Sequence, residues 1–117
     1  MRCEQKVLVT NKDLMVPARK NGYQNLESVS AVAEAAAEEK SPVIMQITPS
    51  VIKYAGLAYI SNLVKTAAQL ASVPVAMHLD HGEDFETVVK CIDAGFTSVM
   101  IDGSFLKFEE NIALTKR

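Results

Sequence analysis

The chain has 117 residues, of which 49% are hydrophobic and 22% are charged, and its formal net charge is −2. This composition is typical of a soluble globular protein. Because no basic block is present, a nucleic-acid or anionic-membrane partner has no electrostatic support. No apolar run approaches the roughly 20 residues of a membrane span. Cys3 and Cys91 lack metal-type spacing, and we expect both to be reduced thiols in a cytoplasmic protein.

The first 25 residues give the weakest pattern. The segment from Thr10 to Asp13 has the composition of a helix N-terminus, but Pro17 would disrupt the helix interior. From residue 26 onward, apolar residues return at helical spacing, which predicts a first helix. Its apolar stripe consists of Leu26, Val29, Ala33 and Ala36.

Three short apolar runs, rich in Val, Ile and Met, are predicted to be strands: Pro42–Ile47, Pro74–Leu79 and Ser98–Ile101. None shows a clean polar alternation, which is typical of strands buried on both faces. Segments with helical apolar spacing separate the three runs. The stripes of these two helices are Leu57, Ile60, Val64, Ala67 and Ala71, and then Phe85, Val88, Val89 and Ile92.

Two residues mark the ends of the last of these helices. Asp84 is suited to cap its N-terminus, and Gly95 is suited to end it. A fourth helix is predicted to begin near Phe108 and to run through Ile112. The acidic pair at 109–110 suits the dipole of that helix start.

The alternation of helices and strands predicts an α/β fold. Strands separated by helices cannot pair as hairpins, so we expect parallel pairing through right-handed crossovers. Two architectures meet this condition, a doubly wound open sheet and a segment of a (β/α)8 barrel. Because no linker or low-complexity segment is present, we expect a single domain over residues 1–117.

Polar residues gather at the carboxyl ends of the three predicted strands. The segments are 48–50 (TPS), 78–82 (HLDHG) and 102–104 (DGS). Ligands bind at these ends in parallel α/β folds, so we expect a site there. Asp80 and His81 are neighbours on a strand and would converge only if the backbone leaves strand geometry, which Gly82 makes easy.

The residue types alone leave alternatives open. An imidazole can bind zinc and a neighbouring carboxylate can act as general acid or base. Without further evidence, His78 is equally a buried strand histidine with a hydrogen-bond partner, and His81 a loop residue near a helix start. Asp102 precedes a glycine, as turn residues often do, and Thr48 and Ser50 suit turn and capping roles.

Four segments together resemble the class II (zinc-dependent) ketose-bisphosphate aldolases, the fructose- and tagatose-bisphosphate aldolase family. They are HLDHG at 78–82, AGFTSVMIDGS at 94–104, FEENIALTK at 108–116 and NLESVSAVAEAAAEEKSPVIMQITPS at 25–50. The resemblance covers the chain from about Leu8 to Arg117 and corresponds to the N-terminal portion of the family. It implies a (β/α)8 barrel, which selects between the two architectures.

The resemblance also implies a reaction and a set of roles. Family members cleave a ketose 1,6-bisphosphate, fructose or tagatose, reversibly to dihydroxyacetone phosphate and glyceraldehyde 3-phosphate. Asp80 would be the catalytic residue that exchanges a proton with the aldehyde oxygen. His81 would bind the catalytic Zn²⁺, which polarises the ketone. Thr48 would lie near the substrate as a binding residue, and Asp102 would occupy a second or alternative metal position.

The sequence departs from the family pattern before the first predicted helix. Residues 22–24 (GYQ) lead straight into 25–27 (NLE), so the first barrel strand is apparently deleted. A full barrel needs about 250 residues, and family members take two further zinc histidines from later strands. We therefore expect the isolated chain to bind zinc weakly and to catalyse nothing measurable. The alternative function is a non-catalytic half-barrel module that self-associates through its strand edges.

Overall fold

The structure is a computed structural model that describes residues 26–117. Its elements are α2 (Leu26–Glu38), β1 (Val43–Ile47), α3 (Pro49–Ala55), α4 (Leu57–Leu70), β2 (Val75–Gly82), α5 (Phe85–Asp93), β3 (Ser98–Ile101) and α6 (Phe108–Thr115). All three predicted strands and the four predicted helices from residue 26 onward are confirmed. The helix expected near Thr10 and the strand deletion expected before Asn25 lie outside the described residues.

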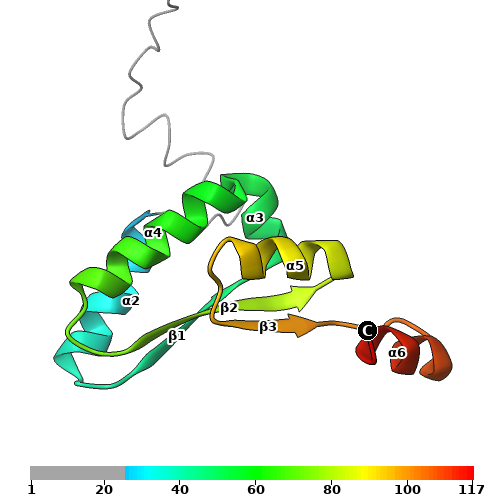
Figure 1. The fold of residues 1–117 in the computed structure, drawn as a ribbon. Coiled ribbons are helices and arrows are strands. Elements are labelled where there is room, and N and C mark those ends of the chain that lie inside the picture. Colours follow the sequence, from blue (N-terminus) through cyan, green and yellow to red (C-terminus); the bar gives the residue numbers. More distant parts are fainter. Residues whose placement is uncertain (1–25) are drawn as a thin grey trace, which may run out of the picture.

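The three strands form one parallel sheet in the order β1-β2-β3. Helices connect successive strands, as Figure 1 shows, so the predicted α/β class is confirmed. Ile47 of β1 pairs with Leu79 of β2, and Leu79 pairs with Val99 of β3. Since parallel strands end at the same edge of a sheet, the residues that follow these pairs come together at that edge.

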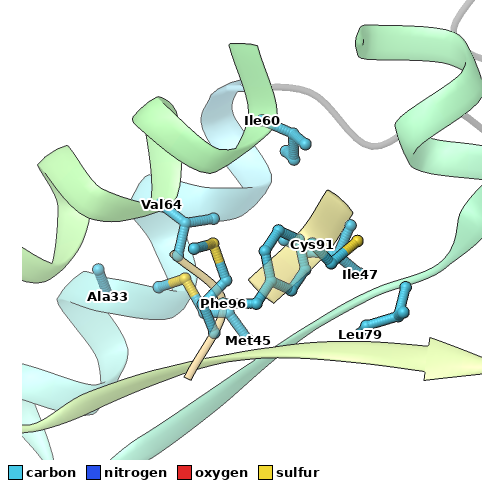
Figure 2. Packing of buried hydrophobic residues seen from close by; sticks show 9 residues of the cluster. Ala33, Met45, Ile47, Ile60, Val64, Leu79, Cys91 and Phe96 are labelled. Carbon is cyan, nitrogen blue, oxygen red and sulfur yellow. The ribbon is translucent and has the colours of Figure 1, made fainter. Parts of the chain in front are cut away.

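The hydrophobic core lies between the sheet and the helices on one of its faces (Figure 2). Alternate residues of β1 and β2 point into it, because side chains alternate across a strand. The helices contribute Ala33, Ile60 and Val64 of the predicted stripes to this core. The stripe predicted for α5 is only partly correct, because Val88 packs on the core whereas Val89 and Ile92 are exposed. The buried cluster consists of Ala33, Met45, Ile47, Ile60, Val64, Met77, Leu79, Cys91 and Phe96. Cys91 is buried and is a free thiol, whereas Cys3 lies outside the described residues.

The other face of the sheet is not covered by any element between residues 26 and 117. Ile44 is 65% exposed and Gln46 is also exposed, although the core residues Met45 and Ile47 alternate with them. The prediction that these strands are buried on both faces is therefore wrong for the described residues. The reason is that α2, α4 and α5 all pack on one side of the sheet, while α6 lies beyond the end of β3 (Figure 1).

The ends of α5 follow the sequence prediction closely. The Asp84 carboxylate accepts a hydrogen bond from the Thr87 N–H at 2.7 Å and caps the helix. At the other end, Gly95 adopts a φ of +91°, and the Phe96 N–H donates to the Cys91 carbonyl. This is the left-handed helix ending for which glycine is favoured.

Two details of the elements differ from the prediction. α3 was not predicted, because Thr48, Pro49 and Ser50 have the composition of a turn. Pro49 is instead the first residue of that helix, a position in which its missing N–H costs nothing. β2 extends to Gly82, past the predicted end at Leu79. None of the helices between residues 26 and 117 has the length and apolar character that crossing a bilayer requires.

Candidate functional site

The end of β2 leaves regular strand geometry at His81. His81 has a φ of +54°, in the left-handed region, and the pairing of β2 with β3 shifts register between Leu79 and Gly82. Such a conformation is uncommon for a residue other than glycine and occurs preferentially at functional sites. The predicted departure from strand geometry is confirmed, and it is what allows Asp80 and His81 to lie at the same edge.

Gly82 has a different role from the one expected. The left-handed residue is His81, and Gly82 instead permits a close approach of two strands. A Cβ at Gly82 would lie 2.5 Å from the Met100 carbonyl oxygen. The Asp102 N–H donates to the Gly82 carbonyl at 2.8 Å. Gly82 therefore fixes the distance between the end of β2 and the start of the loop that follows β3.

The His81 imidazole lies between two carboxylates. Its Nδ1 is 2.7 Å from Asp102 Oδ2, and its Nε2 is 3.9 Å from Asp80 Oδ1. The second oxygen of Asp102, Oδ1, accepts a hydrogen bond from the Ser104 N–H at 2.9 Å. Asp80 and Asp102 are largely shielded, whereas the His81 side chain is 61% exposed. The structure thus brings together three of the four residues predicted from the sequence.

The electrostatics of this cluster follow from the same contacts. The hydrogen bond to Asp102 raises the pKa of His81 above its usual 6.5, and the charge of Asp80 adds to the effect. The His81 hydrogen bond, followed by those from Ser104, lowers the pKa of Asp102 from 3.8 to about 2. Asp102 is therefore a carboxylate at neutral pH, an acceptor that favours a proton on Nδ1.

Thr48, the fourth predicted residue, lies at the same edge but in a separate hydrogen bond. It follows Ile47, the partner of Leu79, so it is level with Asp80. Its hydroxyl is 2.8 Å from the Ser50 hydroxyl, and it is the residue that precedes α3. Its substrate-binding role stays a prediction. His78 is partly buried and bonds the Ser98 hydroxyl through Nδ1 at 2.8 Å, in agreement with a strand histidine that has a partner.

The side chains at this edge can supply one ligand of a zinc site. The His81 side chain is mostly exposed, and its Nε2, which lies 3.9 Å from Asp80 Oδ1, is a suitable zinc ligand. A catalytic zinc takes three protein ligands, but among residues 26–117 no three His, Cys, Asp or Glu side chains are arranged to hold a metal ion. Both oxygens of Asp102 already accept hydrogen bonds. The metal-binding roles of His81 and Asp102 remain predictions.

The fold and the site together indicate the structural class of the protein. Parallel strands joined by helices, with ionisable side chains at their carboxyl ends, are the arrangement found in (β/α)8 barrels. A model of one barrel family, described as "Fructose-bisphosphate aldolase class-II", matches residues 9–117. The chain belongs to the class II fructose-bisphosphate aldolase family, which is zinc-dependent.

Individual relatives agree with this assignment. The chain is 40% identical over 122 residues to a fructose-bisphosphate aldolase of Treponema pallidum, covering 94% of the chain and 37% of that protein. It is 46% identical over 118 residues to the fructose-bisphosphate aldolase of Thermus caldophilus, covering 95% of the chain and 38% of the relative. The chain therefore spans less than half the length of these relatives.

Solved structures match the fold of the described part. The YdjI aldolase from Escherichia coli K12 superposes with a TM-score of 0.73 at 36% identity, covering 80% of this chain and 36% of that one. A putative fructose-1,6-bisphosphate aldolase from Coccidioides immitis gives a TM-score of 0.71 at 33% identity, covering 89% and 44%. The three-stranded sheet and its helices therefore form part of a class II aldolase barrel.

The length of the alignments bears on the strand expected to be deleted. The alignment to the Treponema pallidum relative runs over 122 positions, more than the 117 residues of the chain. The relative therefore has residues without a counterpart here. The deletion of the first barrel strand stays a prediction.

Proposed function

We propose that this chain forms one corner of a class II aldolase active site. The reaction is the reversible cleavage of a ketose 1,6-bisphosphate, fructose or tagatose, to dihydroxyacetone phosphate and glyceraldehyde 3-phosphate. The supporting observation is the left-handed His81, which holds its imidazole beside Asp80 at the carboxyl edge of the sheet. A cytoplasmic setting, in which Cys91 stays a thiol, is part of the proposal.

We assign each residue of the site a separate role in the proposed reaction. Zinc, when bound, polarises the ketone oxygen and stabilises the negative charge that develops there. His81 supplies one ligand through Nε2. Asp80 is mostly shielded from solvent and reaches the same edge, so its carboxylate accepts the hydroxyl proton in cleavage and returns it in condensation. Thr48, level with Asp80, contacts the substrate through its hydroxyl.

Zinc binding by the 117-residue chain tests the ligand assignment. The chain has two histidines, so His78→Ala is a matched control for His81→Ala. Titration calorimetry with Zn²⁺ is expected to show weak binding that His81→Ala abolishes and His78→Ala retains. Equal affinity in the parent chain and His81→Ala would refute the assignment.

A chimera tests the reaction. Residues 75–104 replace the matching segment of the Treponema pallidum aldolase, which supplies the rest of a full-length enzyme. We expect the chimera to cleave fructose bisphosphate, and Asp80→Ala to reduce kcat by about 10²–10⁴-fold, the usual contribution of a general acid or base. Asp84→Ala, in the same segment, is the control and is expected to leave kcat unchanged. A chimera equally active with and without Asp80 would refute the proposal.

A second candidate function is supported by the uncovered part of the sheet. Between residues 26 and 117, β1 and β3 are edge strands, and Ile44 on β1 is exposed. Such edges pair readily with other chains, so the chain could act as a non-catalytic half-barrel that associates with a second copy. Mass measurement in solution separates the two views. A concentration-dependent dimer favours the second function, and a stable monomer contradicts it.

A further inference from the structure

The two nitrogens of His81 lie in different surroundings. Nδ1 is 2.7 Å from a carboxylate oxygen of Asp102, a distance typical of a charge-assisted hydrogen bond. Nε2 is 3.9 Å from Asp80, beyond hydrogen-bonding distance. A carboxylate only accepts hydrogen bonds. The Nδ1 atom must therefore carry the proton in this contact, which leaves the lone pair of the neutral ring on Nε2.

Asp102 is itself held in place from two directions. Its Oδ1 accepts the Ser104 N–H at 2.9 Å, and its own N–H donates to the Gly82 carbonyl. Gly103 allows a further support, since a Cβ there would collide with the side chain of Asn111 in α6. The Asp102 carboxylate is thus fixed relative to the end of β2 before any ligand binds.

We propose that Asp102 is a positioning residue, which selects the Nδ1–H tautomer of His81 and presents Nε2 as the single ligand atom toward the Asp80 side. This places Asp102 behind the imidazole in the metal-free chain, and the metal-binding role that the family resemblance implied for Asp102 stays a separate prediction. The metal-related part rests on the proposed function. The tautomer itself does not, because it is a property of the metal-free chain.

The left-handed backbone of His81 needs support from its surroundings. The conformation costs about 1–3 kcal/mol in most residues, and it persists only where the surroundings hold it. The Asp102 hydrogen bond and the Gly82 backbone contact provide that support on one side of the ring. A carboxylate behind a metal-binding histidine typically changes metal affinity by about 10–100-fold.

Nitrogen NMR of the metal-free, ¹⁵N-labelled chain tests the tautomer directly. At a pH where both imidazoles are neutral, the ring nitrogens of His78 and His81 give separate long-range ¹H–¹⁵N correlations. We expect His81 to be protonated at Nδ1 in the parent chain and mainly at Nε2 in Asp102→Ala. Ser98→Ala is the matched control, because it removes the partner of His78 Nδ1 and is expected to leave the His81 signals unchanged.

The outcomes separate the inference from the function on which it rests. Parent His81 protonated at Nε2 would overturn the positioning role, and this measurement needs no variant that has to fold. An unchanged tautomer in Asp102→Ala, with the His78 signals showing an intact fold, would also overturn it. Zinc affinity is expected to fall about 10–100-fold in Asp102→Ala. If the tautomer is as expected but Zn²⁺ binds independently of His81, the positioning role stands and the proposed function fails.

Discussion

Leu79→Ala should be the most damaging single truncation in the described part of the chain. Leu79 is fully buried at the centre of β2 and is the largest side chain with no exposed surface. It points into the helix-covered core, while its neighbours His78 and Asp80 lie on the opposite face. Replacing a buried leucine by alanine typically costs about 3–5 kcal/mol, through lost burial and the cavity left behind. We expect a loss of at least about 3 kcal/mol in the free energy of unfolding.

Urea denaturation followed by far-ultraviolet circular dichroism measures this loss, since the chain has no tryptophan. Leu70→Ala is the matched control, because Leu70 lies in α4 and is 83% exposed. The control is expected to change stability by about 0.5 kcal/mol or less. Should Leu79→Ala not fold, Leu79→Val provides a smaller step of about 1 kcal/mol. Equal losses for Leu79→Ala and Leu70→Ala would refute this account of the core.

Three further predictions concern the backbone around the site, and the same denaturation assay measures each. Asp84→Ala removes the cap of α5 and should cost about 1 kcal/mol of stability at neutral pH. The hydrogen bonds from Thr87 lower the pKa of Asp84 below 3.8, so the stability difference between the parent chain and Asp84→Ala should vanish as the pH falls through the folded pKa. A stability difference that does not change with pH would contradict this prediction. Gly82→Ala should cost about 1–3 kcal/mol, since its Cβ would press on the Met100 carbonyl, and a neutral effect would contradict that contact. His81→Gly should be about 1 kcal/mol more stable than His81→Ala, because φ is positive at this position, and the reverse order would contradict this account.

Much of the fold could be predicted because its signals are local. The strands are short Val-, Ile- and Met-rich runs, and the caps of α5 are single residues, Asp84 and Gly95, with one clear physical role each. α3 was missed because Thr48 and Pro49 favour a turn as much as a helix start. The deciding factor is whether Val51 and Ile52 can pack on the core, and that depends on tertiary structure.

The candidate site could be predicted as a set of residues but not as a geometry. The sequence places Asp80, His81 and Asp102 at the ends of neighbouring strands. It does not reveal that the register of β2 and β3 shifts before Gly82. That shift determines the contact between His81 Nδ1 and Asp102, and hence which nitrogen remains available. Such a contact depends on how two separate strands align, and no local pattern encodes it.

The core and the site are linked through one strand. The side chain of Leu79 enters the core directly before the backbone departs from strand geometry at His81. Full burial of a leucine contributes about 1.5–3 kcal/mol, which is similar to the cost of one left-handed residue. The burial of Leu79 and the Gly82 backbone contacts can therefore hold His81 in place without a metal. The imidazole and its carboxylate partner should consequently be arranged before zinc binds, so the metal-free chain is the right state in which to measure the tautomer.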